Sequence, residues 1–365
     1  MCLRPVVVAF ALALAACAGP APRPVAPPAP TGDGIAATEI VESFVTALTP
    51  VDNIDSIATW VTPEGGTWLI ATAKDSGRLI VFDGDSGATL RSIGTIGSAP
   101  GQFDRPNGIA VFGDHVFVVE RDNHRVQVLQ LPDFVPAGTF GERALVKPYG
   151  LWLRETAPGE LEVDVTDSYQ NPDDSVPPLA ELSARVKRFR VRMGDGGVEA
   201  ASAILTYGDT TEAGAVRWIE SIVGDPQHDR VLIPEEYIDA EPGEIRVYDH
   251  GGRYRGQDMG SGLFGGQPEG LALYDSCADG SGFWIATDQQ LDSNRFHVFD
   301  RRTLAHVGTF RGRTVQYTDG VALHPLPTAR FPAGVFYAVH HDQGVVAFDW
   351  RDIAAALGLP LDCAP

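Results

Sequence analysis

The chain reads Pro106-Asn107-Gly108-Ile109-Ala110-Val111 at the clearest copy of a motif that recurs along it. In each copy a polar residue and a glycine lead into an alternating apolar strand, which a hairpin and further strands follow. Other copies are Pro148-Tyr149-Gly150-Leu151, Pro268-Glu269-Gly270-Leu271 and Thr318-Asp319-Gly320-Val321, and degenerate ones surround Asp55 and Glu220. The equivalent residues Asp55, Asn107, Tyr149, Glu220, Glu269 and Asp319 are 52, 42, 71, 49 and 50 residues apart. Six units of this length predict an all-β fold, a six-bladed β-propeller.

The ends of the units follow the same repeat. Third strands are expected to end at Phe82-Asp83, Tyr248-Asp249, Phe299-Asp300 and Phe348-Asp349. The longest interval holds a Pro/Asp-rich stretch at 171–182, which predicts a loop insertion. We expect residues 39–48 to add a strand that completes the last blade. The only helix expected is a short turn near 352–357. The propeller domain then occupies residues 33–365.

The N-terminus has the pattern of a secreted lipoprotein. Arg4 precedes an apolar run at 6–16, which is too short for a membrane-spanning helix but suits a signal peptide. Leu14-Ala15-Ala16-Cys17 closes the run and is similar to a bacterial lipobox. We therefore expect a signal peptide at 1–16, a lipidated Cys17 and an Ala/Pro-rich tether at 17–32. The alternative is an ordinary signal peptide with a chance cysteine.

Export and charge limit the partners. Ala18 gives no retention signal, so we expect a lipid anchor at the outer membrane, facing the periplasm or the cell surface. The sequence has 28 Lys+Arg against 48 Asp+Glu, a net charge of −20, which argues against nucleic acid and favours cations as partners. Acidity also keeps an exported protein soluble. We expect a monomer in which Cys277 and Cys363 form a disulfide, and consider a metal role for these two thiols the weaker alternative.

The six equivalent residues are expected to converge. The innermost strand of every blade starts at the same face of the channel, so these side chains form one ring. The ring consists of Asp55, Asn107, Tyr149, Glu220, Glu269 and Asp319. Four carboxylates at close range repel one another unless a cation binds. Hard oxygen donors of this kind indicate calcium.

A second ring is expected one strand later in each unit. It comprises Thr72-Ala73-Lys74, Glu120-Arg121, Thr166-Asp167, Glu235-Glu236, Thr287-Asp288 and His340-His341. Lys74 and Arg121 suit an anionic, metal-bridged substrate, or they form ion pairs with ring carboxylates. We interpret His340 and His341 as a hydrogen-bonded strand end in preference to metal ligands.

Several stretches resemble the β-propeller phytases. They are 52–60, Trp68-Leu69-Ile70-Ala71-Thr72-Ala73-Lys74, Glu220 with Glu236 sixteen residues later, Pro268-Glu269-Gly270-Leu271, Thr318-Asp319-Gly320 and 334–350. The resemblance covers residues 40–355. Separately, residues 101–128 resemble one NHL repeat, which many binding propellers contain.

The phytase resemblance implies a calcium-dependent phosphomonoesterase, a 3-phytase that hydrolyses phytate or a related phosphate ester with metal-activated water. It implies metal ligands at Asp55, Asn107, Glu220, Glu236, Glu269 and Asp319. It places phosphate-binding residues at Lys74, Arg121 and Tyr149, and these three act in catalysis with Glu236. No protein nucleophile is required, since calcium neutralises phosphate oxygens and lowers the pKa of bound water.

The sequence departs from the family at some of these sites. Asp75 and Ser168 stand where the family commonly has lysines, and Gln267 stands where it has an acid. Ser56 and Ile57 replace an Asp-Pro pair. Each lost charged hydrogen bond to phosphate is worth about 1.5–3 kcal/mol, so a simpler phosphate ester is an alternative substrate. Two other functions remain open, a non-catalytic NHL-like binding propeller at the outer membrane and a metal-dependent sugar lactonase.

Overall fold

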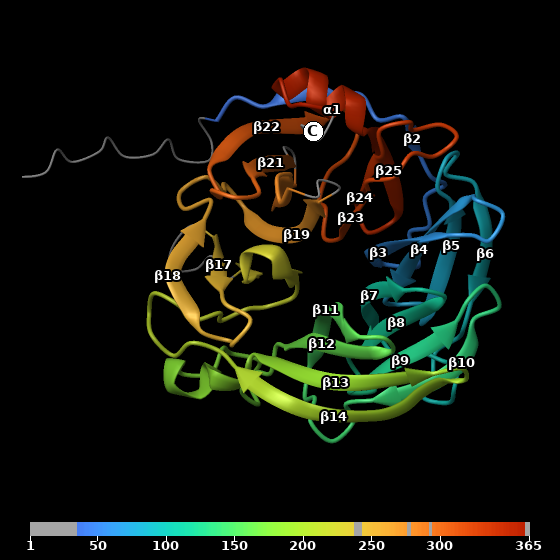
Figure 1. Cartoon of the computed structure of the whole chain (residues 1–365), viewed down its shortest axis with the longest axis vertical. Helices are drawn as coiled ribbons and strands as arrows, with labels where there is room; N and C mark the ends of the chain where they lie inside the picture. The colour runs from blue at the N-terminus through green and yellow to red at the C-terminus, as the bar shows by residue number, and fades with distance from the viewer. Residues whose placement is uncertain (1–34, 237–242, 276–278, 292–293, 362–365) are drawn as a thin grey trace, which may run out of the picture.

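Six β-sheets surround a central axis in the computed structural model (Figure 1). The structure describes residues 35–236, 243–275, 279–291 and 294–361. Blade 1 comprises β3 (Ile54–Val61), β4 (Thr67–Ala73), β5 (Arg78–Asp83) and β6 (Thr89–Ile93). Blade 2 comprises β7 (Pro106–Phe112), β8 (His115–Glu120), β9 (Arg125–Gln130) and β10 (Val135–Phe140). Blade 3 comprises β11 (Pro148–Ala157), β12 (Glu160–Asp167), β13 (Val186–Gly194) and β14 (Gly197–Tyr207).

The other three blades continue the ring. Blade 4 comprises β15 (Val223–Asp225), β16 (Arg230–Glu235), β17 (Glu244–Tyr248) and β18 (Tyr254–Met259). Blade 5 comprises β19 (Gln267–Tyr274), β20 (Phe283–Gln289), β21 (Arg295–Asp300) and β22 (His306–Gly312). Blade 6 comprises β23 (Val321–His324), β24 (Val335–His340) and β25 (Gly344–Asp349). The predicted six-bladed β-propeller is therefore confirmed.

N-terminal strands close the ring. β2 (Phe44–Val45) pairs antiparallel with β25, so it completes blade 6 as expected for residues 39–48. β1 (Thr38–Ile40) lies elsewhere, because it pairs in parallel with β22 and adds a fifth strand to blade 5. The first strands of the chain thus join two neighbouring blades.

The longest blade interval has two causes. Residues 171–182 follow β12 as predicted, and a 3₁₀ turn, η2 (Leu179–Ala184), ends this insertion. The other cause is the length of the β13–β14 hairpin, since β14 alone has 11 residues. The insertion expected from sequence is therefore only part of the extra length.

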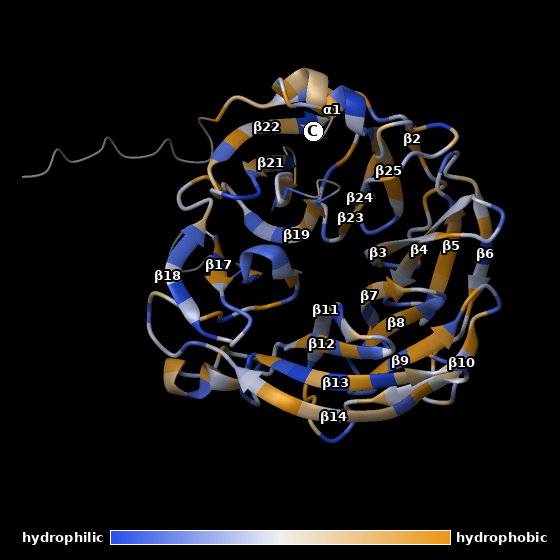
Figure 2. Cartoon of the chain, viewed as in Figure 1, coloured by the Kyte–Doolittle hydropathy of each residue, from blue (hydrophilic) through white to orange (hydrophobic). Residues whose placement is uncertain are grey.

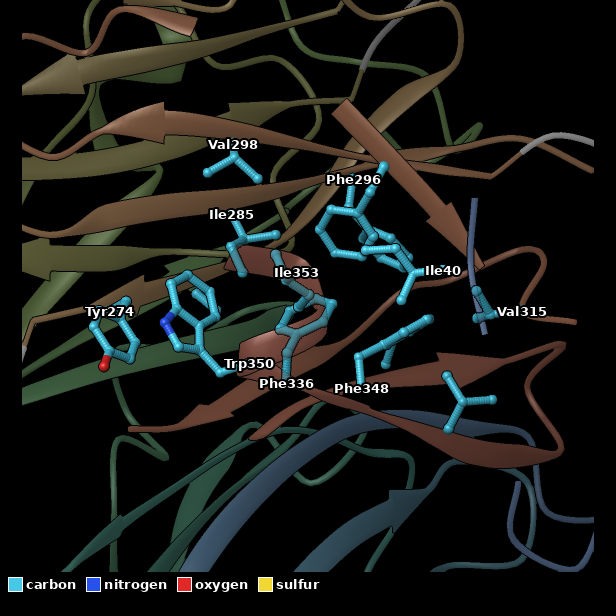
Figure 3. Close-up of a cluster of buried hydrophobic side chains, with 14 residues drawn as sticks. Ile40, Tyr274, Ile285, Phe296, Val298, Val315, Phe336, Phe348, Trp350 and Ile353 are labelled. Atoms are coloured by element: carbon cyan, nitrogen blue, oxygen red, sulfur yellow. The ribbon is translucent and has the colours of Figure 1, made fainter. Parts of the chain in front are cut away.

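Hydrophobic clusters between blades form the core. Figure 2 shows apolar residues along β9 and β25, whereas β18 at the outer edge is mainly polar. One cluster joins blades 5 and 6 to α1 (Trp350–Leu357), the expected C-terminal helical turn (Figure 3). In it the Trp350 ring stacks on Tyr274 at 4.3 Å between ring centroids. No helix in the described residues has the length and apolar character needed to cross a membrane.

The glycine of the repeated motif lets the inner strands come close together. A Cβ atom added at Gly108, Gly150, Gly270 or Gly320 would lie 2.6, 2.1, 2.6 or 2.3 Å from a carbonyl oxygen of the next blade. Those oxygens belong to Tyr149, Glu220, Asp319 and Asp55, which are ring residues. The peptide N–H groups of Gly270 and Gly320 donate to two of these oxygens at 2.9 Å. The polar residue and the glycine therefore recur together, because the glycine leaves room for the backbone of the polar residue in the next blade.

The Gly150→Ala variant is expected to lose about 3 kcal/mol of unfolding free energy, because the new methyl group would meet the rigid Glu220 carbonyl. Gly196→Ala is the matched control, since a Cβ there meets nothing within 4 Å. Urea unfolding of the two variants measures the difference. Equal stabilities would contradict the proposed close approach of the blades.

Candidate metal and substrate site

Five of the six ring residues come together around one cavity. A cavity of about 110 Å³ is lined by five of them, Asp55, Tyr149, Glu220, Glu269 and Asp319. Four of the inner strands have an irregular register at the ring position, at Asp55, Asn107, Tyr149 and Glu269. Such bulges re-aim a side chain, which here directs polar groups to the axis. Aliphatic residues of the same strands line the cavity beyond the glycines, at Ile57, Ile109, Leu151, Val223, Leu271 and Val321.

Three carboxylates are close enough to share a metal ion. Glu220, Glu236 and Glu269 each offer an oxygen, and these oxygens all lie within 4.8 Å of one another. The Glu220 amide donates to Glu236 Oε1 at 3.1 Å, which holds two of the side chains in register. Calcium prefers carboxylate oxygens in flexible geometry, so this donor set fits the predicted ion.

The buried carboxylates of this cluster repel one another when no cation is bound. Burial, followed by repulsion from Asp55, raises the pKa of Glu220 to about 7. Burial raises the pKa values of Glu236 and Glu269 well above their usual range, with repulsion from the neighbouring carboxylates adding to it. A raised pKa favours the protonated form of a carboxyl group, so metal binding at this cluster competes with protons.

In the absence of calcium, these raised pKa values should make stability fall as pH rises. An acid whose pKa is raised in the folded state stabilises the fold while it is protonated, and this contribution is lost as pH rises through the folded pKa. Glu269→Gln removes one such acid, so its thermal midpoint should exceed that of the wild type more at about pH 8 than at about pH 5.5. Thermal melts with a chelator at both values check this. A constant difference would contradict the assignment of a raised pKa to Glu269.

Lys74 lies beside the acids and pairs with them. Its Nζ is 2.8 Å from Asp55 Oδ1 and 3.6 Å from Asp319 Oδ2. It also donates to the Tyr149 hydroxyl at 3.2 Å, and that hydroxyl donates to Asp55 at 3.2 Å. Burial opposes the charge of Lys74, but the two aspartates outweigh it and raise the lysine pKa. The ion-pairing alternative for Lys74 is therefore realised here.

Arg121 pairs with its neighbour in sequence, not with the ring. Its Nε and Nη2 donate to the two oxygens of Asp122 at 2.7 and 3.1 Å. Its charge still interacts with Tyr149 and Glu220, so it belongs to the same mouth. His340 and His341 both form hydrogen bonds with Gln316. The Gln316 backbone amide bonds to His340 Nδ1, and the Gln316 side-chain oxygen bonds to His341 Nε2.

Asn107 lies in the ring but has a different setting from the acids. Its side chain is fully buried, and neither amide atom has a hydrogen-bond partner among the described residues. It does not line the cavity, although Gly108 and Ile109 do. Its backbone carbonyl accepts from the Thr72 hydroxyl at 2.7 Å. The predicted role of Asn107 as a metal ligand stays a prediction.

The members of the expected second ring have different partners. Asp167 accepts from the amides of Val146 and Lys147, and Glu235 accepts from those of Arg217 and Trp218. Asp288 accepts from Gly265 and Gly266, and Glu120 accepts from Asp104. These four acids fasten the loop that leads into their blade's inner strand. The charges of Lys74, Arg121 and Glu236 interact with the cavity acids.

Two residues at the mouth were not predicted from sequence. Trp218 donates its indole N–H to Glu220 Oε1 at 3.4 Å, and its carbonyl accepts from the Glu236 amide at 3.2 Å. Asp342 follows β24, and both His341 and Asp342 have left-handed φ angles, of 52° and 55°. Burial and Asp55 raise the Asp342 pKa. Trp218 could have been predicted as a residue of the mouth from its position two residues before Glu220.

The family departures also have structural partners. Asp75 contacts Arg105 Nη1 at 3.2 Å and accepts from the Asn53 amide group. Gln267 donates to the Glu236 carbonyl at 3.3 Å. The predicted lipid site Cys17, the signal peptide and both cysteines of the expected disulfide, Cys277 and Cys363, lie outside the described residues.

Comparisons with known proteins identify the repeat and the fold. The NHL repeat model matches residues 103–129, which confirms the NHL-like unit in blade 2. No curated protein matches the sequence. A gluconolactonase from Xanthomonas campestris is similar in structure, with a TM-score of 0.53 at 13% identity over 89% of this chain and 98% of that one. A nidogen/laminin complex gives a TM-score of 0.51 at 14% identity over 77% of this chain and 88% of that one. At such identities these likenesses show the fold alone, and the phytase resemblance stays a prediction from sequence.

Proposed function

We propose that this chain is a calcium-dependent phosphomonoesterase whose active site is the acidic channel mouth. One observation carries the proposal: three carboxylates at metal-sharing distance face a lysine whose charge interacts with two of them, Glu220 and Glu269. A metal cluster next to a buried cation suits a phosphate dianion, which needs positive charge on both sides.

Different residues would bind the metal and the phosphate group during hydrolysis. Glu220, Glu236 and Glu269 would hold calcium, which when bound neutralises phosphate oxygens and acidifies water. Lys74 and the Tyr149 hydroxyl present donors at the same cavity, and Arg121 adds charge at its rim. In the reaction a water oxygen forms a bond to phosphorus while the phosphorus–alcohol oxygen bond breaks. The alcohol leaves with a proton, and inorganic phosphate is the second product. Aliphatic residues line the rest of the cavity.

Phosphate release by the full-length chain tests this proposal. We expect turnover of phytate or a simpler phosphate ester with calcium, and its loss with a chelator that added calcium reverses. Absence of release from every ester tested, between about pH 5 and about pH 8, would contradict the proposal. A sugar lactone in the same panel separates a lactonase, which would hydrolyse only the lactone.

A second candidate is a non-catalytic binding propeller. The NHL repeat at 103–129 favours it, as does the pairing of Arg121 with Asp122 and of Lys74 with Asp55. In that case calcium would raise the thermal midpoint without turnover of any ester. Saturable calcium-dependent turnover excludes this candidate.

We also propose that the chain is exported and lipidated at Cys17, as the lipobox-like stretch 14–17 indicates. Mass spectrometry of the mature N-terminus checks this. A mature protein that begins at another residue or carries no lipid would contradict it.

A further inference from the structure

A second circle of residues surrounds the acidic ring. Its members stand two positions before each ring residue, are all half-buried, and are each followed by a buried residue. We call this circle the outer ring, and it consists of Asn53, Arg105, Lys147, Trp218, Gln267 and Tyr317. Asn53, Arg105 and Tyr317 have left-handed φ angles of 52°, 46° and 48°. Such strained backbone in non-glycine residues is concentrated at functional sites.

The outer ring has two unlike halves. Blades 1 to 3 contribute an amide and two cations, Asn53, Arg105 and Lys147. Blades 4 to 6 contribute an indole, an amide and a phenol, from Trp218, Gln267 and Tyr317. The mouth is therefore polar and cationic on one side and aromatic on the other.

The cations of the outer ring already have partners. Arg105 pairs with Asp75 at 3.2 Å. Lys147 donates to the Gln170 side chain and lies 3.8 Å from Asp174. A second phosphate group would have to displace these partners, so the cationic half is poorly prepared to bind one.

Two residues of the aromatic half contact the acidic cluster. Trp218 donates to Glu220, and Gln267 donates to the Glu236 carbonyl. Trp218 and Gln267 thus adjoin two of the acids that would hold the metal, Glu220 and Glu236.

We infer that the alcohol part of the substrate carries a ring that lies against Trp218. The substrate class is then a phosphate monoester of a ring-bearing alcohol, with its single phosphate between the carboxylate cluster and Lys74. Aromatic side chains stack on flat or apolar ring faces, and Trp218 offers such a side chain next to the charged cluster. This inference rests on the proposed phosphatase function and names its substrate class.

Benzyl phosphate and ethyl phosphate are the matched probes, since one alcohol has a ring and the other has none. We expect kcat/KM to favour benzyl phosphate by about tenfold in the wild type. Trp218→Leu should remove most of this preference. Trp218→Phe should keep it, because phenylalanine retains the ring and loses only the hydrogen bond to Glu220. Arg105→Leu, on the cationic half, is the control and should leave the preference unchanged.

The outcomes separate the two proposals. Turnover of both esters with no ring preference, or a preference unchanged in Trp218→Leu, overturns this inference alone. A phytate kcat/KM that greatly exceeds that of both esters and falls in Arg105→Leu overturns it too, since a second phosphate would then use the cationic half. Absence of turnover of all three esters overturns the proposed function and this inference with it.

Discussion

The Glu236→Gln variant is expected to lose calcium-dependent phosphate release by about 100-fold or more. Changing even an indirect partner of a metal ligand reduces metal affinity by about 10- to 100-fold, and Glu236 is itself a candidate ligand. Its oxygen lies within 4.8 Å of those offered by Glu220 and Glu269, so loss of its charge weakens the whole cluster. Initial rates over a calcium titration measure the effect.

The same variant should behave differently without calcium. Glu236 is buried and repelled by Glu269 and Glu220, so a neutral amide there should raise the thermal midpoint of the chelated protein. Glu64→Gln, an exposed change in the turn between β3 and β4, is the control and should alter neither property. Full turnover by Glu236→Gln at ordinary calcium concentrations would remove Glu236 from the site.

The Lys74→Met variant is expected to lose about 3 kcal/mol of unfolding free energy in calcium-free buffer. Removing one partner of a buried ion pair costs about 3–5 kcal/mol, because the other charge stays buried and uncompensated. Here Asp55 and Asp319 both lose a partner, and Asp55 is 1% exposed. Urea unfolding with a chelator measures the loss.

Calcium and a charge-conserving change test the role of Lys74 further. Bound calcium supplies positive charge to the same acids, so the loss in Lys74→Met should become smaller when calcium is added. Lys74→Arg keeps the charge and should remain close to the wild type in stability. Equal stability of the two variants without calcium would show that the charge of Lys74 does not balance the negative charge of the ring carboxylates.

The blade repeat and the ring could be predicted from sequence because one local constraint recurs. Gly108, Gly150, Gly270 and Gly320 each adjoin the next blade's backbone, so the motif is visible at these four blades. At Ser56 and Ser221 the glycine is replaced, and these are the copies that are degenerate in sequence. The motif therefore reflects a steric requirement between neighbouring blades, and its spacing predicts a six-bladed propeller.

Side-chain direction at the end of the second strand could not be predicted in this way. Glu235 and Glu236 are adjacent, yet Glu235 binds loop amides and Glu236 joins the carboxylate cluster. Arg121 could reach either the ring or Asp122, and the neighbouring carboxylate forms the two-point contact. Trp218 and Asp342 enter the mouth from loops, which have no strand period that would indicate their direction.

A crystal structure of the chain grown with calcium tests the acidic mouth most directly. We expect an ion bound by oxygens of Glu220, Glu236 and Glu269 at about 2.3–2.6 Å. Lys74 should still contact Asp55, or should have turned toward a phosphate present in the crystal. A map at saturating calcium that shows no ion between these three carboxylates would contradict the proposed metal site and the hydrolysis that depends on it.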